Sequence, residues 1–342
     1  MRERALVRRL LGALAACAAL LAGTLIAALP AAADPSTVRI GLLKFGTVSW
    51  EIETLRAHGM DRARGFTLEV VDLANPEAGK IGLLGNSVDV IVSDWLWTAR
   101  QRADGEALAF LPYSSAVGSV MVPADSPVRT LADLKGRKLG VAGGPLDKGW
   151  LLIRALALRD HGIDLPSAAT PVFAAPPLLN QQALTGGLDA VLTYWHFAAR
   201  LEARGFRSIA GVEQAATALT DGAVAVPSIG FVFREAWAQR NPALVDAFFA
   251  ASLEAKALLQ TSDTAWDAVR PLMRAEDEAT FEALRAGYRA GIPQRWGAAE
   301  KAAAAKVFAL MADLGGKDLV GPAVDLPDGT FWPGPTVPPG SR

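Results

Sequence analysis

The alternation of apolar strands with short helices constrains the fold of this 342-residue chain more than any other feature. The segment VDVIVS at residues 88–93 is almost continuously apolar, as expected of a strand that helices cover on both faces. Strand and helix patterns alternate before it, at residues 37–46, 50–58, 65–74 and 78–84. The order strand, helix, strand, helix, strand is typical of a parallel, doubly wound sheet.

A second unit with the same organisation begins near residue 116. Its segment LDAVLTYW at 188–195 repeats the organisation of VDVIVSDW at 88–95. After residue 224 one strand enters a helix, and the rest is predicted to be helical, at 242–259, 262–273, 279–290 and 298–314. We expect Gly315 to end the last helix and the Pro- and Gly-rich tail to be extended or frayed. With 51% hydrophobic residues, the chain is long enough for two packed lobes or domains.

The first 33 residues have the pattern of a secretory signal peptide. A basic start precedes an apolar stretch from Leu10 to Leu29, and an A-x-A end predicts cleavage after Ala33. The apolar stretch could also remain as a membrane anchor. The sequence LAAC around Cys17 resembles a lipobox, but apolar residues follow it, so we favour removal of the segment over lipidation of Cys17.

Composition excludes several functional classes. Cys17 is the only cysteine, so the mature chain has no thiol for catalysis or for a Cys-dependent metal site. The net charge is −1, and the part after the basic start is modestly acidic, so it lacks the basic surface expected for nucleic-acid binding. The catalytic patterns HExxH, GxSxG and GxxxxGK[ST] are absent. We therefore expect no catalysis, no cofactor and no metal.

Five stretches carry a resemblance to a known family. They are VRIGLLKFG at 38–46, RGFTLEVVDLA at 64–74, LLGNSVDVIVSDW at 83–95, SPVRTLADLKGRKLGVAGG at 126–144 and ALTGGLDAVLTYWHFAARLEARGF at 183–206. These segments resemble the periplasmic solute-binding proteins of ABC importers of the nitrate, sulfonate and taurine type, a family that also contains thiamine-precursor binders. A related branch makes a thiamine pyrimidine with a histidine and a cysteine-rich motif, which the mature chain lacks.

The resemblance implies an α/β fold in which two lobes form a clamp. Each lobe would hold a doubly wound, mostly parallel sheet, with extra helices at the C-terminal end. Lobe I would comprise residues 34–117 and 223–342, and lobe II residues 118–222, with crossings near 115–120 and 222–230. Ligand would bind in the cleft, and the closed form would dock on a membrane permease that works with a cytoplasmic ATPase. We expect the protein to be a periplasmic monomer.

Candidate ligand residues follow from the general rule that open parallel sheets bind ligands outside the carboxyl ends of their strands. Aromatic side chains recur at these positions and suit a flat or cationic ligand. The residues selected are Lys44, Phe45, Thr47, Ser49 and Trp50 after the first strand; Asp94, Trp95 and Trp97; Tyr113 and Ser114; Gly143, Gly144, Asp147 and Lys148; and Tyr194, Trp195 and His196.

Several of these residues have a second interpretation. Asp94 could cap the helix that follows it, and only one of Trp95 and Trp97 needs to face the cleft. The loop GGPLDKG at 143–149 could hold an anion at a helix N-terminus, although its proline removes one N–H and Asp147 adds repulsion. Lys44 and Lys148 could be solvated, and His196 could simply be packed among aromatic residues.

The predicted function is that of the periplasmic substrate-binding component of an ABC importer, which captures a small organic molecule. The tryptophans with Asp94 and Asp147 favour an N-heterocycle or an amine. The alternative ligand is a sulfonate or another small anion, held by Lys44, Ser49 and the amides of Gly143 and Gly144. The alternative function is that of a periplasmic sensor or accessory protein that presents its loaded form to a receptor or an enzyme.

Overall fold

The computed structural model describes residues 36–43, 46–220, 222 and 224–334. The predicted signal peptide with Cys17 lies outside the described residues, as do Lys44 and Phe45 of the predicted site. No helix in the described part of the chain is long and apolar enough to cross a membrane.

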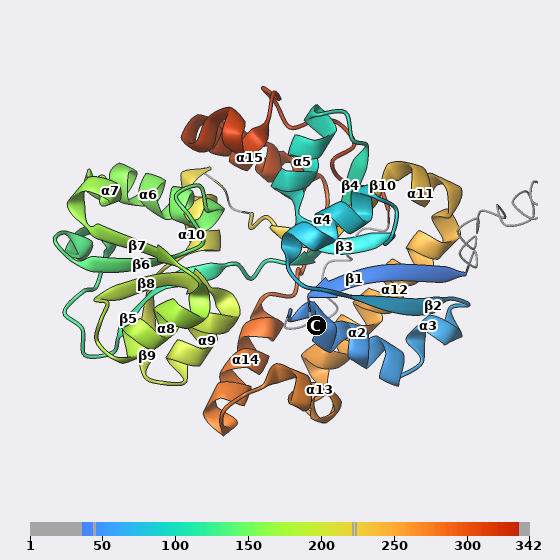
Figure 1. The fold of residues 1–342 in the computed structure, drawn as a ribbon, viewed down its shortest axis with the longest axis horizontal. Coiled ribbons are helices and arrows are strands. Elements are labelled where there is room, and N and C mark those ends of the chain that lie inside the picture. Colours follow the sequence, from blue (N-terminus) through green and yellow to red (C-terminus); the bar gives the residue numbers. More distant parts are fainter. Residues whose placement is uncertain (1–35, 44–45, 221, 223, 335–342) are drawn as a thin grey trace, which may run out of the picture. The chain divides into compact units, whose positions relative to one another are not determined.

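The first sheet has five strands in the order β2-β1-β3-β10-β4 (Figure 1). Its strands are β1 (Thr37–Leu43), β2 (Thr67–Leu73), β3 (Val90–Asp94), β4 (Leu108–Ser114) and β10 (Ile229–Arg234). Strands β1 and β3 pair in parallel, whereas β10 lies antiparallel between β3 and β4. The carboxyl ends of β1, β3 and β4 therefore point to one edge of this sheet.

The second sheet repeats this arrangement in the order β7-β6-β8-β5-β9. Its strands are β5 (Gly118–Pro123), β6 (Lys138–Ala142), β7 (Thr170–Ala174), β8 (Ala190–Tyr194) and β9 (Phe206–Gly211). Strand β6 pairs in parallel with β7 and β8, and β5 lies antiparallel between β8 and β9. The repeat of the first half by the second, read from the sequence, is confirmed.

The chain passes between the two sheets twice, after β4 and before β10. In each case the first strand after the passage is the antiparallel one, inserted between two strands of its sheet. The predicted α/β fold with two doubly wound, mostly parallel sheets is confirmed. Residues 38–342 form one compact unit, so the predicted lobe boundaries at 117/118 and 222/223 stay a prediction.

Helices cover both sheets and continue as a helical C-terminal part. They are α2 (Val48–Ala57), α3 (Met60–Ala63), α4 (Pro76–Leu84), α5 (Trp95–Ala103), the 3₁₀ turn η1 (Leu131–Leu134), α6 (Lys148–His161), α7 (Leu165–Ala168), α8 (Pro176–Leu184), α9 (Trp195–Glu202), α10 (Val212–Leu219), α11 (Glu235–Arg240), α12 (Pro242–Thr261), α13 (Ala265–Met273), α14 (Glu278–Ala290) and α15 (Ala298–Val320).

Local chemistry sets several helix starts. Asn75 caps α4, which has a proline at its first position, and Asp277 caps α14 through the backbone N–H of Thr280 at 2.8 Å. Because helices cover both faces, strand residues such as Val90 and Val141 are fully buried. This burial of apolar surface is the main stabilising contribution to the two sheets.

At the C-terminal end, the helix predicted at 298–314 is interrupted where expected, because Gly316 has a non-helical backbone with φ of 58°. A second helical segment, which the sequence did not indicate, follows this kink and extends α15 to Val320. Of the two alternatives predicted for the tail, the structure shows the extended one at Phe331, which forms a parallel bridge to Phe110 of β4, and the Trp332 N–H donates to the Phe110 carbonyl at 2.9 Å. The Phe331 ring also packs on Trp296, with the ring centroids 4.9 Å apart.

Candidate functional site

One cavity of ≈ 520 Å³ lies where the strand ends of the two sheets meet. Its wall includes the carboxyl ends of β1, β3, β4, β6 and β8 and the first residues of the antiparallel strands β5 and β10. This volume suits a small organic molecule. Ten of the predicted residues line the cavity: Thr47, Asp94, Trp95, Tyr113, Ser114, Asp147, Lys148, Tyr194, Trp195 and His196.

Five other predicted residues do not line the cavity, namely Ser49, Trp50, Trp97, Gly143 and Gly144. The Ser49 hydroxyl donates to the Gly46 carbonyl at 2.6 Å, and Trp50 is 4% exposed and packs on Trp195 with the ring centroids 5.9 Å apart. The Trp97 ring lies beneath the Lys80 ammonium. Trp50 and Trp97 both lie in the first turn of a helix, where the turn of about 100° per residue directs some side chains away from the strand ends.

The cavity also contains residues that the sequence did not indicate. Lys80 in α4 comes soon after the carboxyl end of β2, so the strand-end rule could have selected it. Glu213 in α10 lies two residues after the carboxyl end of β9, so the same rule could have selected it if the strand at 206–211 had been recognised. No such signal exists for Val307 and Met311 in α15, because only tertiary packing brings this helix to the strand ends.

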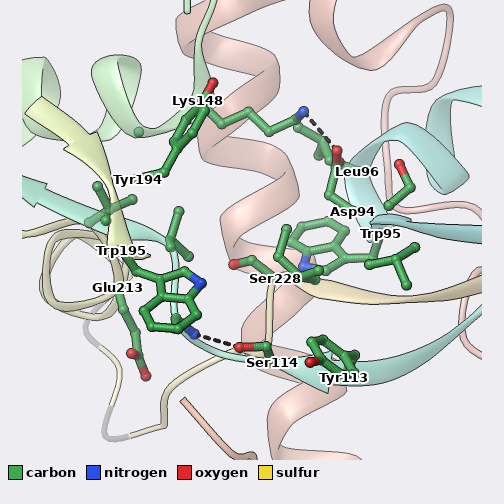
Figure 2. Close-up of a pocket in the computed structure, with 18 of the residues that line it drawn as sticks. Asp94, Trp95, Leu96, Tyr113, Ser114, Lys148, Tyr194, Trp195, Glu213 and Ser228 are labelled. Atoms are coloured by element: carbon green, nitrogen blue, oxygen red, sulfur yellow. Dashed lines mark hydrogen bonds and ion pairs between the residues drawn. The ribbon is translucent and has the colours of Figure 1, made fainter. Parts of the chain in front are cut away.

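Asp94 both caps a helix and forms an ion pair across the cavity (Figure 2). Its Oδ1 accepts the Trp97 N–H at 2.8 Å, at the start of α5. Its Oδ2 accepts a hydrogen bond from Lys148 Nζ at 2.9 Å. Since Asp94 ends β3 of the first sheet and Lys148 begins α6 after β6 of the second, this ion pair joins the two halves of the cavity wall.

Asp147 caps the facing helix, α6, by accepting the Trp150 N–H at 3.1 Å. The helix N-terminus that could have held an anion is thus already satisfied by a carboxylate of the chain itself. Gly143 has a φ of 88°, and a Cβ there would lie 3.1 Å from Asp147 Oδ2, which explains the glycine. Gly143 and Gly144, considered for an anion cradle, are not among the residues that line the cavity.

Burial and nearby charges set the ionisation of the lining groups. Burial lowers the pKa of Lys148, but the charge and hydrogen bond of Asp94 and the charge of Asp147 outweigh it, so the pKa is raised and the ammonium is retained. Burial raises the pKa of Asp147, although its hydrogen bonds to Trp150 and Gly149 and the charge of Lys148 oppose this effect.

Two lining groups stay neutral at pH 7. Burial, followed by the charge of Asp147, raises the pKa of the Tyr194 hydroxyl to about 12. Burial, followed by the charge of Arg200, lowers the pKa of His196 to about 4. Tyr194 and His196 can therefore offer a ligand neutral hydrogen-bonding groups.

Two tryptophans contribute to the cavity from different sheets. Trp95 begins α5 after β3 and is 3% exposed, with its ring against Phe331. Trp195 begins α9 after β8 and is only partly buried. Figure 2 shows the two indoles on different sides of the cavity. Among the described residues no group of three or more His, Cys, Asp or Glu side chains is arranged to hold a metal ion.

One comparison with known proteins identifies the family of this chain. The family model described as NMT1/THI5 like matches residues 62–262, which is more than half of the chain. A comparison with the curated proteins finds no match.

Solved structures share the fold at low sequence identity. The periplasmic aliphatic sulphonate binding protein SsuA from Escherichia coli has a TM-score of 0.67 and 20% identity, covering 87% of this chain and 98% of that one. The alkanesulfonate-binding protein SsuA from Xanthomonas axonopodis pv. citri, bound to MOPS, has a TM-score of 0.62 and 21% identity, and the match covers 88% of this chain and 99% of that one. The periplasmic nitrate-binding protein NrtA from Synechocystis PCC 6803 has a TM-score of 0.53 and 12% identity, and the match covers 77% of this chain and 71% of that one. The resemblance read from the five sequence segments is confirmed.

Proposed function

This chain belongs to the NMT1/THI5-like family, and we propose that it is the periplasmic solute-binding component of an ABC import system. It captures a small organic molecule in the cavity and delivers it to a membrane permease. The observation that carries this proposal is the position of the cavity, at the carboxyl ends of strands from both sheets.

The mechanism is recognition coupled to closure. A ligand that contacts both halves of the cavity wall binds the closed form better than the open form, and so shifts the population toward the closed form. The permease then distinguishes the loaded protein from the empty one by its shape. No residue is assigned a catalytic role.

We favour an N-heterocycle or an amine over a sulfonate as the ligand. Asp94 and Asp147 cap the two helices that begin beside Lys148, so a bound anion would meet carboxylates in place of free helix N–H groups. Lys148, the cation among the cavity-lining residues of the second half, is already paired with Asp94. The sensor alternative has no observation in its favour, and genes for a permease and an ATPase next to this one would argue against it.

The test is thermal unfolding of residues 34–342 with panels of N-heterocycles, amines, sulfonates and small inorganic anions. A ligand at about 100 times its dissociation constant stabilises the folded state by about 2.7 kcal/mol, which raises the unfolding midpoint by several degrees. We expect stabilisation by amines or N-heterocycles. The binding function itself is contradicted if no member of any panel raises the midpoint.

Export and assembly need separate experiments. We expect the protein recovered from the periplasm to begin at Asp34, which N-terminal sequencing would check. Lipid attached at Cys17 would instead indicate membrane anchoring. We also expect a monomer, and light scattering on the purified mature chain would reveal any dimer.

A further inference from the structure

Glu213 is a cavity residue that the sequence patterns did not indicate. It lies in the first turn of α10 and lines the cavity. Figure 2 shows it on the same side of the cavity as Trp195, away from Trp95 and Tyr113. Its side chain is half-buried.

Among the residues that the structure describes, the charged ones that line the cavity are Lys80, Asp94, Asp147, Lys148 and Glu213. Lys148 pairs with Asp94 at 2.9 Å, and Lys80 pairs with Glu77, just outside the lining, at 2.8 Å. Asp147 accepts a backbone N–H. The Glu213 carboxylate forms no hydrogen bond or ion pair with the side chain or backbone of any residue that the structure describes. His196, the histidine among the described lining residues, is neutral at pH 7 and so cannot supply a positive charge.

A half-buried carboxylate without a partner has lost part of its hydration and gained nothing in return. Consistent with this, burial raises the pKa of Glu213. A ligand group that donates N–H hydrogen bonds and carries positive charge would replace the hydration that the Glu213 carboxylate lost on burial. An anionic ligand group at the same place would add repulsion.

We propose that Glu213 selects the ligand by accepting a hydrogen bond from its protonated nitrogen, so that the ligand is an organic cation with an N–H donor. The rest of the ligand lies against the apolar and aromatic wall, where Trp195 can also attract the positive charge with its ring face. This inference rests on the proposed function, since it assumes that the cavity binds a small molecule.

The experiment compares probes of matched size and different charge at pH 7. Phenethylamine, benzamidine and histamine serve as cations, 2-phenylethanol as a neutral probe and benzenesulfonate as an anion. Dissociation constants are measured by calorimetry for the mature wild-type chain and for Glu213→Gln, Glu213→Asp and Glu202→Gln. Glu202 is the matched control, because burial also raises its pKa but it does not line the cavity.

We expect at least one cationic probe to bind the wild type, and Glu213→Gln to weaken this binding about tenfold or more. Glu213→Asp keeps the charge and should keep the preference for cations, and Glu202→Gln should change affinity by less than about twofold. Circular dichroism confirms that each variant is folded.

Two results would overturn the inference and leave the binding function intact. One is binding of a cationic probe with equal affinity to the wild type and to Glu213→Gln. The other is binding of benzenesulfonate or 2-phenylethanol by the wild type in preference to every cationic probe. If no probe of any charge binds, the inference and the proposed function both fail.

Discussion

His196 illustrates how position alters the chemistry of a single residue. Its ring lies between those of Trp195 and Phe197, at centroid distances of 5.7 Å and 4.5 Å, and it also lines the cavity. The sequence left packing and ligand contact as alternatives, and the structure places the ring where both are available. Its lowered pKa makes it a neutral polar group of the wall.

The low pKa of His196 predicts a pH dependence of stability. The folded-state pKa of about 4 lies below the usual value of 6.5, so the unfolded chain binds more protons between these values. Stability from this group is therefore complete above pH 6.5 and is lost as the pH falls toward 4, by up to about 3 kcal/mol. Denaturant unfolding between pH 4 and 7 should show a shallower pH dependence for His196→Asn than for the wild type. Equal slopes would contradict the neutral assignment.

The tryptophans differ in what their removal would do. Trp195→Ala should weaken ligand binding about tenfold or more, because its partly exposed indole lines the cavity. Trp97→Ala is the control and should change affinity by less than about twofold, since Trp97 does not line the cavity. Trp95→Ala is less informative, because a side chain that is 3% exposed costs about 3–5 kcal/mol of stability when truncated. Equal affinity of Trp195→Ala and the wild type would show that the Trp195 ring does not contribute to ligand binding.

At the scale of elements, helix starts supply the charges of the cavity. Helices α5 and α6 begin directly after strand ends, and each carries its own aspartate cap. The ion pair between Asp94 and Lys148 then connects the two helix starts. It is partly exposed, so we expect it to contribute about 1 kcal/mol or less to the free energy of unfolding.

The variant Asp94→Asn separates the charge of this residue from its capping role. Asparagine caps helices as well as aspartate does, so α5 should stay intact. Loss of the negative charge should weaken a cationic ligand about tenfold and leave an anionic ligand unaffected or bound more tightly. Asp277→Asn, at the start of α14 away from the cavity, is the control in the same calorimetric titration. Stronger binding of a cation by Asp94→Asn would contradict the assignment.

A buried polar network joins three helices behind the cavity wall. Glu51 of α2 accepts hydrogen bonds from Ser252 at 2.6 Å and Tyr288 at 3.1 Å, and it pairs with Lys256 of α12. The Lys256 ammonium lies 4.1 Å from the ring centroid of Tyr113, which lines the cavity. Burial lowers the pKa of Lys256, although the charge and hydrogen bond of Glu51 oppose this effect. The network therefore connects α2 to Tyr113 in the cavity wall.

Removing one partner of the Glu51–Lys256 ion pair should destabilise the protein more than replacing both partners. Glu51→Gln leaves the Lys256 charge buried without its partner and should reduce the free energy of unfolding by about 3–5 kcal/mol. In Glu51→Gln/Lys256→Met the uncompensated charge is gone, so much of the loss should be recovered. Urea unfolding of Glu51→Gln, Lys256→Met and the double variant measures these free energies. Additive losses would show that the two side chains do not interact.

At the scale of the whole molecule, the C-terminal helices connect elements of both sheets. Helix α14 packs against α9, and α15 packs against α5 and α6 (Figure 1). The close contact of α14 with α9 depends on Gly287, where a Cβ would lie 3.0 Å from the Trp195 ring. Arg200 of α9 donates to the Met273 carbonyl at 2.9 Å, and Arg204 pairs with Asp277 at 3.1 Å. The helices that follow β10 therefore pack against helices from both sheets.

The predicted lobe boundaries can be tested with residues 118–222 alone. All five strands of the second sheet lie within this segment, so we expect it to fold. It should be less stable than the full chain, because it loses the packing of α9 on α14 and of α6 on α15. Dispersed amide signals in NMR spectra would support the boundaries. A disordered fragment would show that the second sheet needs the C-terminal helices.

The sequence by itself determined the order of strands and helices, the repeat of the two halves and most of the residues at the strand ends. These features depend on local periodicity, on caps such as Asp94 and Asp147, and on the rule that strand ends bind ligands. It could not determine which side chains of a first helical turn face the cavity, so Trp50 and Trp97 were selected along with Trp195.

Only the tertiary structure decided the pairing of Lys148 with Asp94 and the position of Val307 and Met311 at the cavity. It also decided that Phe331 in the tail pairs with β4. These contacts join residues far apart in the chain, and they depend on how whole helices pack. Local sequence patterns do not reveal contacts between residues that are distant in the chain. The free energy that favours one packing of the helices comes from the apolar surface buried by many elements together.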